Sequence, residues 1–227
     1  MIGKSWVAGI LVLASATAAA AASEVAGPTA GGSAPAAYSQ PQPQGLITIF
    51  SNMGGKYPKA IYFCCNGFFI QGPTSGGHEL WDAQAFTPSV NRTLRRIEVA
   101  LAYGGGTNQA VIGLYSDNAG VPGTALRSWR VSNVPNYQTC CVVEAVTDSA
   151  GIPVTAGVQY WVVVKTGSTD RDASIGWLYN TTDQVDAVPF AQYCSKDAGG
   201  APCSTANDKW SAIGGQIPGL AFAVKGD

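Results

Sequence analysis

Residues 93–103, TLRRIEVALAY, begin the stretch that decides the fold. Every second side chain from Ile97 to Tyr103 is apolar, so an extended chain places these side chains on one face. Four further strand-like segments follow up to Lys165: QAVIGLYS, ALRSWRV, CCVVEAV and GVQYWVVVK. DNAGVPG, at 117–123, separates two of them with the residues of a tight turn. The sequence therefore predicts an all-β protein, an antiparallel β-sandwich resembling a jelly roll.

Other segments extend this prediction. AIYFCC and NGFFIQG are expected to form a hairpin closed at Asn66-Gly67, because Asn-Gly suits a type I′ turn. DSAGIPVTAG, at 148–157, has the Gly and Pro content of a loop. The apolar segment GLAFAVKG, at 219–226, is expected to be an interior strand. No stretch of useful length has a 3.6-residue period, so little helix is expected.

The N-terminal part of the sequence is of another kind. Residues 1–22 combine Lys4, an apolar run and several Ala-x-Ala sites, which is typical of a secretory signal peptide. Residues 23–44 are rich in Ala, Gly, Pro and Gln and are expected to be a disordered tether. Residues 45–227 would form the single β-sandwich domain. No later segment is apolar and long enough to span a bilayer, so the expected location is secreted or extracytoplasmic, in the periplasm or at the cell surface.

Charge bears on the choice of partner. Charged residues make up 12% of the chain and the formal net charge is −1. Nucleic acid is an unlikely partner, because the chain has no basic stripe to follow a phosphate backbone. An extracellular polysaccharide or a cell-surface protein fits this composition better. The sequence indicates no cofactor.

Cysteines support an exported protein. An even number of Cys in an exported chain suggests disulfide bonds. A local bridge between Cys194 and Cys203 is the simplest pairing. The two vicinal pairs are expected to bridge to each other across neighbouring strands: Cys64, Cys65, Cys140 and Cys141.

Candidate chemistry is sparse. His78 is the single His and stands in HELWD, which lacks the second His of a zinc-protease motif, and no G-x-S-x-G elbow occurs. Glu98 and Glu144 could form a glycosidase pair only if their carboxyl groups face each other. Five turn carboxylates are weak calcium candidates, although Asp also serves turns by bonding its own backbone: Asp117, Asp170, Asp172, Asp183 and Asp186. The sequence predicts no catalytic residue, so a protein that is not an enzyme is expected.

Aromatic side chains are the more useful lead. Trp161 lies in an apolar strand and is expected in the core. Flat aromatic rings offer an apolar face with a polar edge, which suits stacking on sugar rings. The residues expected to contact a ligand in this way are Trp81, Trp177, Tyr179 and Trp210.

A family resemblance agrees with this assignment. The segments SNMGG, LYSDNAGVPG and AGVQYW resemble the exported bacterial β-sandwich domains of the choice-of-anchor type, from about Ile49 to the C-terminus. The resemblance implies a jelly-roll-like sandwich in a surface or secreted protein and implies no activity. The expected function is therefore a non-catalytic binding module for extracellular carbohydrate or a surface partner. A structural matrix component that assembles through sheet edges and, less favoured, a glycoside-processing enzyme are the alternatives.

Overall fold

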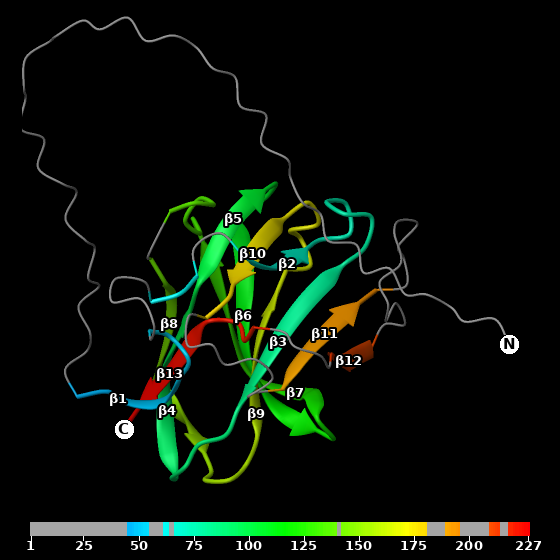
Figure 1. The fold of residues 1–227 in the computed structure, drawn as a ribbon. Helices are drawn as coiled ribbons and strands as arrows, with labels where there is room; N and C mark the ends of the chain where they lie inside the picture. Colours follow the sequence, from blue (N-terminus) through cyan, green and yellow to red (C-terminus); the bar gives the residue numbers. More distant parts are fainter. Residues whose placement is uncertain are drawn as a thin grey trace, which may run out of the picture. The chain divides into compact units, whose positions relative to one another are not determined.

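The computed structural model describes residues 45–54, 61–63, 66–139, 142–180, 189–195, 209–213 and 218–227. These residues form antiparallel β-strands and contain no helix (Figure 1). The prediction of an all-β antiparallel sandwich is therefore confirmed. The expected signal peptide and tether lie outside the described residues. No helix in the described ranges meets the length and hydropathy needed for a membrane span.

The strands form a smaller and a larger sheet. The smaller sheet has the order β1-β13-β4-β8, with bounds Ile47–Ser51, Phe222–Gly226, Arg92–Val99 and Glu144–Val154. The larger sheet has the order β5-β10-β2-β3-β9-β6-β7, with bounds Leu101–Gly105, Ser174–Leu178, Gly67–Gln71, Leu80–Phe86, Tyr160–Lys165, Gln109–Asn118 and Val121–Ser132. Two further strands extend it from the other edge of β3, namely β11 (Phe190–Cys194) and β12 (Lys209–Ile213).

The segment that decides the fold belongs to both sheets. The sequence predicted one continuous strand, but the strand breaks at Ala100 into β4 and β5. Ala100 accepts a hydrogen bond from the Leu178 amide at 2.9 Å and donates one to the Ala221 carbonyl at 3.1 Å. Ile97 on β4 and Leu101 on β5 are both buried in one cluster. The two-residue alternation therefore continues across the break, because both sheets turn the same side of this segment toward the core.

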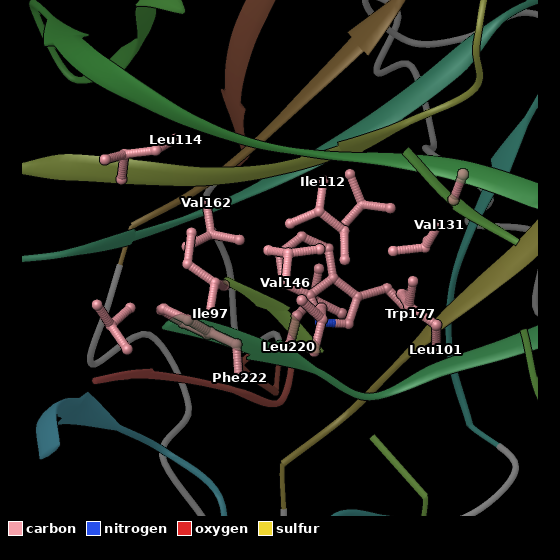
Figure 2. Packing of buried hydrophobic residues seen from close by; sticks show 14 of the residues in the cluster. Ile97, Leu101, Ile112, Leu114, Val131, Val146, Val162, Trp177, Leu220 and Phe222 are labelled. Carbon is pink, nitrogen blue, oxygen red and sulfur yellow. The ribbon is translucent and has the colours of Figure 1, made fainter. Parts of the chain in front are cut away.

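Large apolar side chains from both sheets fill the space between them (Figure 2). Trp177 and Phe222 are fully buried there, with ring centroids 6.3 Å apart. The Trp177 Nε1 donates to the Ala221 carbonyl at 3.0 Å. This bond satisfies the polar atom of an otherwise apolar side chain, so Trp177 is part of the packed core.

Two local predictions are wrong, for identifiable reasons. Residues 148–157 do not form a loop throughout, because β8 continues to Val154. β8 is an edge strand, and its pairing with β4 has a register irregularity. Edge strands and such irregularities tolerate Gly and Pro, here Gly151 and Pro153. The hairpin at Asn66-Gly67 is also wrong: residues 61–63 lie outside any strand, and β2 pairs with β10. The prediction of an interior last strand is confirmed, since β13 lies between β1 and β4.

The larger sheet has a second, smaller core on its outer face, away from the smaller sheet. Cα atoms of the edge strands β7 and β12 lie within 8 Å of each other, so the sheet curls toward this face. The curl encloses a cluster of small and aromatic side chains: Ala83, Ala85, Tyr115, Trp161, Val163 and Ala191. Val121 and Trp210 from the two edge strands pack against this cluster. Trp161 is therefore buried as expected, but on the outer face.

Candidate binding site

One cross-strand row of side chains runs over the outer face beside the second core. Register pairs Arg130 with Val111, Val111 with Lys165, Trp81 with Tyr193, and Tyr193 with Trp210. Lys165 follows Val164, the partner of Asp82, so it lies beside Trp81. We call this set the outer row: Arg130, Val111, Lys165, Trp81, Tyr193 and Trp210. Neighbouring strands are about 4.8 Å apart, so the row extends for about 24 Å along the sheet.

Trp81 is the centre of the row. Its ring stacks on Tyr193 from β11, with centroids 4.2 Å apart and planes 19° apart. From β9, on the other side of β3, the Lys165 ammonium lies 4.8 Å from the centroid of the same ring. This distance is within the range of a cation–π contact. The ring centroids of Trp210 and Trp81 are 6.2 Å apart, and the two ring planes are 51° apart. Strand pairing thus fixes a rigid aromatic group next to a held cation.

A cavity of about 540 Å³ opens at the cationic half of the row. It lies where β3 begins and β9 ends, and the segment after β9 forms part of its wall. The side chains that give it its chemical character are Glu79, Trp81, Val111, Arg130, Lys165 and Arg171. The cavity is thus bordered by an aromatic ring, by cations and by one carboxylate, all except Arg171 on residues in or next to paired strands. Such a mixture suits a polar ligand with some apolar surface.

Hydrogen bonds hold the cavity wall in place. Arg130 Nη1 lies 2.7 Å from the Asp170 carboxylate, and the Thr169 hydroxyl donates to the same carboxylate at 2.9 Å. The Asp170 side chain is only 4% exposed, so this ion pair is shielded on its acidic side. The Thr166 hydroxyl donates to Glu79 at 3.3 Å. Gly167 packs against the ion pair so closely that a Cβ atom there would collide with both partners.

Positive charge is in excess on the cavity wall. Three cationic side chains, Arg130, Lys165 and Arg171, face one carboxylate, Glu79. Counting Asp170, which holds Arg130, the wall keeps one uncompensated positive charge. Neither Lys165 nor Arg171 forms a salt bridge with another described residue. Within the described residues, the cavity therefore carries two cations that have no salt-bridge partner.

The inner side of β3 carries a buried acid beneath this site. Asp82 is fully buried and accepts a hydrogen bond from Gln192 at 2.9 Å, while its second carboxylate oxygen has no partner among the described residues. Burial raises the pKa of Asp82 to about 7, against the lowering effect of the Gln192 bond. Burial and the charge of Asp82 also raise the pKa of Tyr179.

Of the four aromatic residues predicted to contact a ligand, the structure places two in the outer row and two outside it. Trp81 and Trp210 come together in the outer row. The prediction that Trp177 contacts a ligand is wrong, because its side chain is fully buried between the sheets. Tyr179 follows β10 and lies edge-on to Phe68 with ring centroids 5.6 Å apart, so it is not part of the row. A ligand contact at Trp81 and Trp210 stays a prediction.

Three of the carboxylates predicted to bind calcium accept hydrogen bonds or form an ion pair within the protein. Asp117 accepts from Trp161 Nε1 at 2.8 Å, from Gln159 at 2.7 Å and from the Gly120 amide at 3.2 Å. Burial alone would raise the pKa of Asp117, but these bonds outweigh it and lower the pKa. Asp172 accepts from Thr107 at 2.6 Å, and Asp170 holds Arg130. Asp183 and Asp186 lie outside the described residues. Among the residues that the structure describes, no three His, Cys, Asp or Glu side chains gather as metal ligands would.

The carboxylate pair proposed for glycoside hydrolysis does not form. Register places Glu98 opposite Ala145 and Glu144 opposite Val99. Since neighbouring residues of a strand point to opposite faces, the two carboxylates lie on opposite sides of the smaller sheet. Glu98 is instead bound by Arg96 at 2.8 Å and by Lys225 at 3.0 Å. The two residues therefore cannot flank one glycosidic bond.

His78 and the cysteines give no further site. The His78 ring lies 3.1 Å from the Gln71 amide nitrogen, and no nucleophilic hydroxyl bonds to it within the described ranges. Cys194 ends β11 and is buried. Its expected bridge to Cys203 stays a prediction, because Cys203 lies outside the described residues. The same holds for the vicinal pairs, Cys64, Cys65, Cys140 and Cys141.

Sequence reasoning missed Tyr193, Lys165 and Arg130. Each belongs to a segment whose alternation alone shows two faces but not which strands are neighbours. Tyr193 contacts Trp81 because β11 pairs with β3, and β3 lies more than 100 residues before β11 in the sequence. Comparison with known proteins finds no matching family model, no matching curated protein and no matching solved structure.

Proposed function

We propose that this protein is an exported, non-catalytic module that binds extracellular carbohydrate through the outer row and the adjoining cavity. The observation that carries the proposal is the placement of Trp81, Tyr193 and Trp210 side by side, next to a cavity of about 540 Å³. Sugars present polar hydroxyl groups and patches of C–H surface, so they bind where an aromatic side chain stands next to hydrogen-bonding groups.

Rigidity supports the proposal. All members of the outer row lie on paired strands, and Trp81 is held between Tyr193 and Lys165. Ligand binding to such a preorganised surface loses little conformational entropy. The charged groups at the cavity can also bond neutral hydroxyl groups, because Arg and Lys donate and Glu accepts. The leader-like residues 1–22 support an extracellular location for this surface.

The test is binding to glycans, both soluble and insoluble. The full chain is applied to a glycan array and to insoluble polysaccharides, and retained protein is measured. We expect retention that falls about tenfold in Trp210→Ala and in Trp81→Leu. Phe69→Ala is the matched control, since Phe69 is an aromatic of the larger sheet that is 54% exposed and outside the row. If no glycan retains the protein, or if the row variants bind as well as the control, the proposal is wrong.

A further inference from the structure

The outer row changes character along its length. At the β11 and β12 end it is aromatic, with Tyr193 and Trp210. At the β9 and β7 end it carries Lys165 and Arg130, and the cavity beside them adds Arg171. A ligand that spans the row would therefore meet stacking groups at one end and positive charge at the other. A neutral sugar can accept hydrogen bonds from these cations, but only an anionic one also compensates their charge.

Lys165 is the most informative of the cations. Its ammonium is held over the Trp81 ring at 4.8 Å, and it forms no salt bridge in the described part of the chain. A cation on an aromatic face is partly removed from water, so it interacts more strongly with an incoming anion than a freely solvated Lys does. Lys165 also lies directly between the aromatic end and Arg130, through the register of β9 with β6.

Arg130 and Arg171 both border the same cavity. Arg130 uses Nη1 for Asp170 and for Gln109, and its other guanidinium N–H groups have no acceptor among the described residues. Arg171 is exposed and follows Asp170 directly. An arginine fork bonds carboxylate and sulfate oxygens through paired N–H groups. The opposing charge in the cavity is Glu79, which receives the Thr166 hydroxyl.

From this arrangement we infer that the ligand is an acidic saccharide, one whose carboxylate or sulfate group occupies the cavity between Lys165 and Arg171 while its ring contacts Trp81. This inference rests on the proposed function and names the ligand class of the same site. The shared chemistry is an oxyanion attached to a sugar. A uronic acid and a sulfate ester would both supply it.

The experiment compares matched polymers by affinity electrophoresis of the full chain. The probes are polygalacturonate against its fully methyl-esterified form, and dextran sulfate against dextran. Retardation by polygalacturonate at least about tenfold stronger than by its neutral ester supports a uronic acid, and the same ratio for dextran sulfate over dextran supports a sulfate ester. Added salt should weaken the acidic interaction, because exposed charges are screened.

Variants locate the anion. Lys165→Met keeps an unbranched side chain beside Trp81 and removes the charge, so binding to the acidic polymer should fall about tenfold. Lys165→Arg should keep most of the binding. Arg171→Gln should weaken it severalfold. Arg92→Gln on β4 removes one positive charge from the other sheet and is the control for net charge. If Lys165→Met and Arg92→Gln have equal effects, the inference is wrong.

The outcomes separate this inference from the proposed function. Binding of neutral and acidic polymers with equal strength, lost in Trp210→Ala, would keep carbohydrate binding and overturn the acidic ligand. Retardation by polyglutamate equal to that by polygalacturonate would show an anion site without sugar recognition and would overturn both. Absence of retardation by any of the four polymers would overturn the acidic ligand, while retention on the glycan array decides carbohydrate binding separately.

Discussion

The two faces of the larger sheet differ in how they are used. The inner face packs large aliphatic and aromatic side chains against the smaller sheet, and its Trp177 is fully buried with its N–H bonded inside the core. The outer face combines Ala and Gly with a few aromatics and then opens into a cavity bordered by cations. The same residue type thus has two roles, because strand register decides whether a Trp fills space or borders a binding site.

The largest expected effect comes from the inner face. Trp177→Ala should lower the free energy of unfolding by about 3–5 kcal/mol, since it removes a large buried side chain and leaves a cavity. Trp210→Ala, at the partly exposed edge of the outer face, should cost about 1–2 kcal/mol. Urea unfolding followed by fluorescence measures both. Equal losses for the two variants would contradict the distinction between the faces.

Asp82 tests the inner face in another way. Its pKa is raised to about 7 in the folded protein, so between about pH 4 and pH 7 the unfolded chain releases a proton that the folded protein keeps. Stability from this group is therefore full below about pH 4 and declines as pH rises toward 7. The loss is of the order of 4 kcal/mol for such a shift.

Asp82→Asn is the matched variant for this effect, because an amide resembles the protonated acid. We expect it to be more stable than the parent at pH 8 and about equal to it at pH 4, with a flatter dependence between these values. The readout is the urea midpoint measured at several pH values. A parent protein whose stability rises from pH 5 to pH 8 while the variant follows the same curve would contradict a buried neutral carboxyl group at position 82.

The sequence allowed part of this comparison to be predicted and not the rest. The alternation at Ile97 and Leu101 predicted an all-β fold correctly, because burial of one strand face is a local pattern. Trp177 followed the same pattern and was misjudged, since alternation shows that a strand has two faces but not what covers each. Lys165 was missed as a neighbour of Trp81, because that contact depends on the pairing of β3 with β9, far apart in the chain.

Asp117 sharpens the comparison on the outer face. Its carboxylate is the partner of the buried Trp161 Nε1 at 2.8 Å. Asp117→Ala should destabilise the protein by about 1–3 kcal/mol, because it leaves an indole N–H buried without an acceptor. Asp117→Asn keeps an acceptor oxygen and should cost less. Because hydrogen bonds lower the pKa of Asp117, its contribution is present at neutral pH and is lost as pH falls below about 4.

Thermal unfolding of the three proteins at pH 7 and at pH 3 measures this effect. The difference between the parent and Asp117→Asn should shrink at the lower pH. The alanine variant should remain less stable than both at pH 7. A calcium site at Asp117 would behave differently: added calcium would raise the unfolding temperature of the parent and not of the variants, and that result would contradict the turn role assigned here.

Phe69 gives the smallest expected effect and sets the baseline for the outer face. Phe69 is 54% exposed, and one atom of its ring lies close to Gly104, outside the second core. Phe69→Ala should change the free energy of unfolding by no more than about 0.5 kcal/mol, as most surface substitutions do, and should leave glycan retention unchanged. A loss of retention as large as that of Trp210→Ala would move the binding surface from the outer row toward β2, since Phe69 has no part in the cavity at Lys165.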